Sequence, residues 1–154
     1  MGRHALIIRD IYIERYRWYV HCYFAVNKYY TDEILELLES LGCSYSVYDR
    51  VAVKLERDDL NTGFTYSNKG TRETLMVVGK ASSSEEYINS ITHELRHLCD
   101  DIASVTNMQT SGEEVAYLTG DIASQIADVI QVLACNCLNC LEKRYKKIRP
   151  TWKR

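Results

Sequence analysis

Proline is almost absent from this sequence, and phenylalanine and glycine are scarce. The 154 residues include one proline, two phenylalanines and seven glycines. This composition leaves no room for a long disordered linker. No apolar run approaches the roughly 20 residues that a membrane-spanning helix needs. With 46% apolar residues, the chain is instead expected to form one globular domain around its own core.

The beginning of the sequence does not resemble a secretory signal, because Arg9 and Asp10 interrupt its apolar run. Six cysteines in a chain without such a signal indicate reduced thiols rather than a disulfide framework. Together these features predict a cytoplasmic protein that does not associate with membranes.

Charge is distributed unevenly along the chain. Seven of the 19 basic residues lie in residues 143–154, whereas all 21 acidic residues precede that segment. We therefore expect a single domain over residues 1–142 and a basic tail over 143–154. An acidic body argues against nucleic acid as a partner, and the tail is interpreted as a solvated helix end.

Hydrophobic patterns in the first half predict mostly strands. Residues 5–13 and 18–26 are expected to form a hairpin, and residues 62–68 and 73–78 a second one with a turn at Lys69 and Gly70. Between the hairpins, residues 31–41 are typical of a helix, with Thr31 as N-cap and Gly42 at its end. Residues 43–47 suggest a short strand, and residues 49–60 fit a helix or a strand equally well.

Two helices are expected in the second half. Ser82 with Glu85, or Ser83 with Glu86, forms a capping box, so the first helix should begin near Ser83 and run to about residue 103. The second should run from Glu113 to about residue 134. The fold class is therefore α+β.

The first of these helices carries the motif His93-Glu94-Leu95-Arg96-His97. Residues four apart share a helical face, so His93 and His97 are positioned to bind one Zn²⁺ ion. Glu94 stands beside them, where a general base is needed. An apolar stripe on the same helix, formed by Ile88, Ile91, Leu95, Leu98 and Ile102, is expected to face the core.

A third zinc ligand is expected from the start of the second helix. Glu113 is preferred because it shares a face with small residues, whereas Glu114 completes a capping box with Ser111. Tyr117, one turn after Glu113, is a candidate donor to a histidine or to an oxyanion, and ordinary packing explains it equally well. Asp101, or alternatively Asp100, is the expected partner that orients a ligand histidine.

Four segments resemble small zincin-like proteins of gut bacteria and their phages or mobile elements. They are residues 61–68 (Asn-Thr-Gly-Phe-Thr-Tyr-Ser-Asn), 77–83 (Val-Val-Gly-Lys-Ala-Ser-Ser), 93–97 and 112–120 (Gly-Glu-Glu-Val-Ala-Tyr-Leu-Thr-Gly). The resemblance implies a minimal gluzincin-type metallopeptidase fold, in which a sheet packs on the active-site helix. It also implies that an edge strand, 62–68 or 73–78, binds an extended substrate, with Thr65, Tyr66 and Arg72 as candidate groove residues.

Two functions follow as hypotheses. The first is zinc-dependent hydrolysis of a peptide bond in a peptide or protein substrate, with Glu94 as general base. The second is a non-catalytic, zinc-stabilised domain of phage or mobile-element origin that binds a protein partner. Cys135, Cys137 and Cys140 suggest a further metal site, but a structural zinc site has four ligands, and simple thiols are the simpler interpretation.

Overall fold

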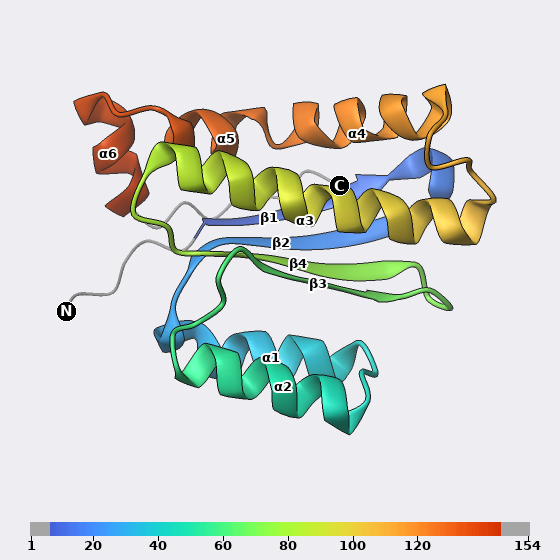
Figure 1. Cartoon of the computed structure of the whole chain (residues 1–154), viewed down its shortest axis with the longest axis horizontal. Coiled ribbons are helices and arrows are strands. Elements are labelled where there is room, and N and C mark those ends of the chain that lie inside the picture. The colour runs from blue at the N-terminus through green and yellow to red at the C-terminus, as the bar shows by residue number, and fades with distance from the viewer. Residues whose placement is uncertain (1–6, 146–154) are drawn as a thin grey trace.

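A four-stranded sheet with helices on both faces forms the body of the protein (Figure 1). The computed structural model describes residues 7–145. The strands are β1 (Ile7–Ile13), β2 (Trp18–Val26), β3 (Gly63–Asn68) and β4 (Glu73–Gly79). The α-helices are α1 (Thr31–Ser40), α2 (Tyr45–Glu56), α3 (Ser84–Thr106), α4 (Glu113–Gln125), α5 (Ala127–Ala134) and α6 (Leu138–Tyr145). Short 3-10 turns, η1 (Glu14–Tyr16) and η2 (Lys28–Tyr30), follow β1 and β2.

The strands lie in the order β1-β2-β4-β3. Both predicted hairpins are present, because β1 pairs with β2 and β3 pairs with β4 in antiparallel fashion. The two hairpins join through a parallel pairing of β2 with β4. As a result β3 is an edge strand, and it lies next to α3.

Helices α3, α4 and α5 cover one face of the sheet (Figure 1). Alternate residues of β2, including Trp18, Val20 and Cys22, point to this face and are fully buried. They pack against the predicted apolar stripe of α3, of which Ile91, Leu95, Leu98 and Ile102 are buried while Ile88 is 40% exposed.

Helices α1 and α2 cover the other face. Their apolar residues pack on Tyr23, Leu75 and Val77 of the central strands. Gly42 adopts a φ of +76° directly after α1, and its amide donates to Glu39 O at 2.9 Å. This left-handed conformation ends α1 as its sequence predicted.

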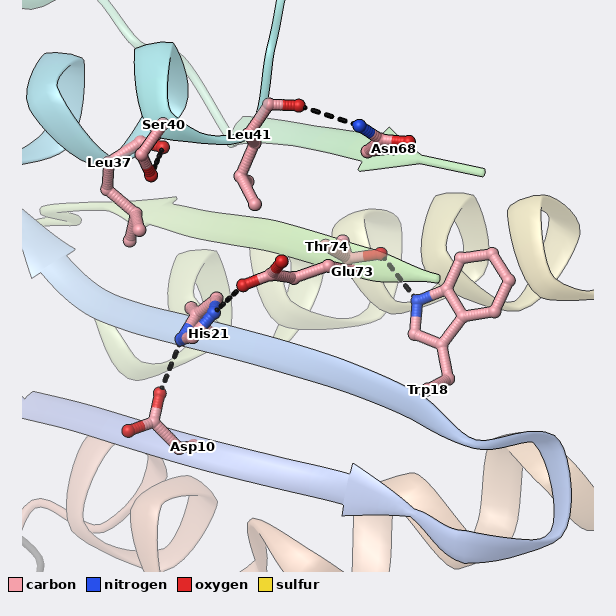
Figure 2. Close-up of polar contacts among 9 residues, drawn as sticks. All are labelled: Asp10, Trp18, His21, Leu37, Ser40, Leu41, Asn68, Glu73 and Thr74. Carbon is pink, nitrogen blue, oxygen red and sulfur yellow. Dashed lines mark hydrogen bonds and ion pairs between the residues drawn. The ribbon is translucent and has the colours of Figure 1, made fainter. Parts of the chain in front are cut away.

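Two sets of polar contacts link the strands, and Figure 2 shows the Trp18–Thr74 hydrogen bond of one and the His21 contacts of the other. The Trp18 indole donates to Thr74 Oγ1 at 2.8 Å, and Thr74 Oγ1 lies 2.7 Å from Ser67 Oγ. These contacts join β2, β4 and β3 on the face of the sheet that α3 covers. On the opposite face, His21 lies between two carboxylates, 2.9 Å from Asp10 and 2.7 Å from Glu73.

The predicted α+β class is confirmed, with a mixed sheet. Three local predictions are wrong, and the open choice between helix and strand at 49–60 is resolved. Thr31 is not the N-cap of α1: Tyr30 holds that position, and Thr31 Oγ1 donates to Lys28 O at 2.7 Å. The strand expected at 43–47 is the start of α2, whose N-cap is Ser44. The ambiguous segment 49–60 is mostly helical, since α2 continues to Glu56.

The single helix expected from Glu113 to about residue 134 is interrupted at Ile126, where φ is −111° and ψ is 16°. No glycine or proline marks this break, and Ile126 is fully buried between α4 and α5. The apolar residues of α4 and α5 keep the same helical spacing across the break, which explains why the sequence pattern alone predicts one helix.

Among the described residues, none of the helices has the length and apolar character required to cross a membrane. The predicted boundary between residues 142 and 143 falls inside α6, which extends to Tyr145. The rest of the predicted basic tail lies outside the described residues.

Candidate functional site

Helix α3 presents the motif, and its first turn is fixed by two side chains. Ser83 Oγ accepts from the Glu86 amide at 3.2 Å, while Glu86 accepts from Ser82 N and Ser82 Oγ at 2.9 Å. The capping box therefore forms in the Ser83–Glu86 register. These hydrogen bonds, beginning with that from the Ser82 amide, lower the pKa of Glu86. The helix ends at Asn107, whose φ of 56° is left-handed.

His93 and His97 bring their imidazole nitrogens together on the exposed side of α3. The two Nε2 atoms lie 3.1 Å apart, and the rings meet edge to face at 75°. Zinc lies roughly 2.0–2.1 Å from an imidazole nitrogen, so two nitrogens on one tetrahedral ion are roughly 3.3 Å apart. In this structure the two rings share a hydrogen bond, and their spacing is also close to that of two ligands on one zinc ion.

Glu94 points from the same turn toward β3 and is 1% exposed. Its carboxylate accepts from Thr62 Oγ1 at 3.0 Å and from Thr65 Oγ1 at 2.8 Å. Each carboxylate oxygen thus receives one hydroxyl donor, and the side chain is held in a single orientation. The motif alone does not reveal these threonines, because they lie about 30 residues earlier in the chain.

A cleft of about 430 Å³ lies between α3, β3 and the loop before β3. His93, Glu94, His97 and Asp101 line its α3 side, and residues 60–65 with Lys54 line the opposite side. The β3 side chains are all half-buried. The motif therefore faces a groove bounded by an edge strand rather than open solvent alone.

The structure does not bring the predicted third ligand to the histidines. Among the described residues, the group of three or more His, Cys, Asp or Glu side chains that could hold a metal ion is Cys135, Cys137 and Cys140. Glu113 is exposed at the start of α4 and does not form such a group with His93 and His97.

The capping role expected of Glu114 is wrong. The N-cap of α4 is Gly112, which makes no side-chain cap. Glu114 instead accepts from Tyr16 Oη at 3.1 Å and pairs with Arg15 at 3.3 Å, which ties α4 to the β1–β2 connection. Burial and the Glu114 hydrogen bond raise the pKa of Tyr16.

The remaining candidates have other surroundings or partners, although Asp101 lines the same cleft as the histidines. Tyr117 is 70% exposed. Asp101 pairs with Lys69 at 3.6 Å and Asp100 with Arg96 at 3.0 Å. In the described part of the chain, neither of these ion pairs involves a histidine. Arg72 donates to Tyr16 O at 2.8 Å, so its guanidinium supports the first hairpin.

Comparison with known proteins gives no relative. No family model, no curated protein and no solved structure matches the chain. The geometry of the motif, the cleft and the edge strand is therefore the basis for any functional assignment.

Proposed function

We propose that this protein is a zinc-dependent hydrolase that cleaves a peptide bond in an extended substrate. His93 and His97 would hold the ion, and Glu94 would accept the proton of the attacking water. The observation that supports this proposal is the 3.1 Å approach of the two Nε2 atoms on the turn that also carries Glu94 into the cleft.

Bound zinc would supply a Lewis acid for the scissile carbonyl and lower the pKa of water. The chain's own contribution is the placement of the base. Thr62 and Thr65 fix the Glu94 carboxylate, and each of its oxygens keeps a lone pair for a water molecule in the cleft. A base held in this way needs no reorientation when the proton moves.

The edge strand β3 is the proposed binding surface for substrate. Its partner β4 occupies one side, so the backbone groups on the other side are available to an extended peptide beside the motif. The Thr65 hydroxyl on β3 donates to the Glu94 carboxylate, so the proposed substrate-binding strand is hydrogen-bonded to the proposed base.

A second function is favoured by a different observation. Glu94 is 1% exposed, and Glu113 does not join the histidines in a three-ligand group. Both features suit a non-catalytic zinc domain that binds a protein partner, in which Glu94 fixes β3 to α3.

A peptide-library cleavage assay with added zinc separates the two functions. The wild-type protein is compared with Glu94→Gln, which keeps the shape of the side chain, and with Glu85→Gln, an exposed control on the same helix. The hydrolase proposal expects cleavage by the wild type and by Glu85→Gln, and a loss of at least about 100-fold in Glu94→Gln. Equal turnover by Glu94→Gln, or no cleavage by any of the three, contradicts it.

Metal analysis tests the histidine pair directly. Zinc content should fall on the double substitution His93→Ala/His97→Ala and persist in Thr92→Ala, an exposed neighbour on α3. If the double variant retains the same zinc affinity at this site, the histidines are not its ligands.

A further inference from the structure

Three cysteines gather where α5 gives way to α6. The Sγ atoms of Cys135, Cys137 and Cys140 all lie within 4.8 Å of one another. None of the three forms a disulfide, and their exposure differs: Cys137 is exposed, Cys135 half-buried and Cys140 buried at 5%. The sequence spacing suggested this cluster, and the structure brings its sulfurs together.

The local backbone directs amide hydrogens at the sulfurs. The Cys137 amide donates to Cys135 Sγ, and the Cys140 amide to Cys137 Sγ, both at 3.4 Å. Such donors stabilise a thiolate, the form that binds metal.

The loop is anchored to the rest of the fold. Ser84 Oγ, at the first residue of α3, donates to Asn136 Oδ1 at 2.7 Å. The Cys135 amide donates to Gln131 O at 3.0 Å and closes α5, while Leu141 N donates to Cys137 O at 3.0 Å within the first turn of α6. The three sulfurs are therefore positioned by two helix ends and a tertiary contact.

We propose that Cys135, Cys137 and Cys140 form a second metal site, which binds one thiolate-preferring ion, Zn²⁺. With zinc–sulfur bonds of roughly 2.3 Å, tetrahedral geometry places two sulfurs roughly 3.8 Å apart. The three sulfurs of the cluster lie within 4.8 Å of one another, so small shifts would suffice to bind the ion. Three thiolates leave one position for an external ligand, and the exposed Cys137 marks the open side.

This site is separate from the histidine pair. Ser84, its anchor, precedes His93 by nine residues on α3, which is roughly 14 Å along a helix. The second site therefore does not depend on the proposed hydrolase function. Because the ion would bridge the end of α5 and the start of α6, its role is to fix the corner between these two helices.

Titration with Co²⁺, a spectroscopic substitute for zinc, tests the proposal on the fully reduced full-length chain. The His93→Ala/His97→Ala background removes the other candidate site. We expect one equivalent of Co²⁺ to produce a sulfur-to-metal charge-transfer band, which excess Zn²⁺ then displaces. Loss of a group that only orients a metal ligand lowers metal affinity about 10–100-fold. Cys137 is proposed as a ligand itself, so Cys137→Ser should lower Co²⁺ affinity at least as much.

Three variants make up the test, two within the cluster and one outside it. Cys137→Ser leaves the core untouched, because Cys137 is exposed, and Cys140→Ala should give the same loss. Cys43→Ser, a half-buried cysteine outside the cluster, should leave the band unchanged. The proposal is wrong if the reduced chain gives no band, if the band survives both cluster substitutions, or if Cys43→Ser abolishes it. It is also wrong if the chain forms a Cys137–Cys140 disulfide and, once reduced, fails to take up Co²⁺.

Discussion

At the scale of single residues, buried polar groups in this protein are held in short chains of hydrogen bonds. The motif predicted which side chains of α3 carry chemistry, namely His93, Glu94 and His97. It could not predict that Thr62 and Thr65 hold Glu94, since that contact depends on β3 packing beside α3. Nor did the sequence reveal the carboxylates on either side of His21, because they lie on two other strands.

Thr74 is fully buried and accepts from the Trp18 indole. Thr74→Val keeps the volume but leaves the indole N–H without its acceptor. An unsatisfied buried donor costs about 1–3 kcal/mol, so the free energy of unfolding should fall by that amount in urea denaturation. Ser46→Ala, an exposed serine on α2, serves as control. A Thr74→Val variant as stable as the wild type would show that this bond is dispensable.

His21 should make stability depend on pH. Its hydrogen bond to Asp10, opposed by burial and aided by Glu73, raises its pKa above 6.5. A raised folded pKa gives stabilisation that is full below the unfolded pKa of about 6.5 and is lost as pH rises through the folded value. The stability difference between the wild type and His21→Gln should therefore shrink between pH 6 and pH 9. Urea denaturation at several pH values measures it, and a constant difference contradicts the prediction.

At the scale of elements, hydrophobic periodicity predicted the hairpins and α3 well. It failed where tertiary packing determines the secondary structure of a segment. Residues 45–56 mix valines with charges, and their helix becomes clear only because Val51 and Leu55 pack on α1 and the sheet. The break at Ile126 also has no local signal. Both failures concern segments whose conformation depends on their neighbours.

The start of β3 depends on Gly63, whose φ is +141°. A Cβ at this position would lie 1.9 Å from the Val77 carbonyl oxygen. Gly63→Ala should therefore cost at least about 1–3 kcal/mol of strain and displace the strand that holds Glu94. Thermal unfolding would show the loss of stability. Gly120→Ala, which meets no atom within 4 Å, is the control and should not destabilise α4.

At the scale of the whole molecule, the order of the strands is what the sequence could not supply. The central pairing joins β2 to β4 across residues 27–72, an interval that contains α1, α2 and β3. Short-range patterns predict each hairpin but not the parallel contact between them. That contact places the edge strand, and hence the cleft, beside the motif.

Zinc should stabilise the whole fold if the proposed sites are occupied only in the folded state. One site at 100 times its dissociation constant adds about 2.7 kcal/mol, so zinc should raise the melting temperature and a chelator should lower it. His93→Ala/His97→Ala and Cys137→Ser should each remove part of the shift, and the combined variant should remove all of it. Calorimetry with and without zinc measures the shift, and an unchanged melting temperature would contradict both sites.

The exposed histidine pair has a practical consequence for purification. Two imidazoles one helical turn apart, with their nitrogens 3.1 Å from each other, form a chelating group on a rigid support. The untagged protein should therefore be retained on immobilised nickel resin and elute with imidazole. Replacing either histidine by alanine should release it earlier, because a single imidazole holds the resin-bound ion less tightly. Column retention thus measures the geometry of the pair without any assumption about catalysis.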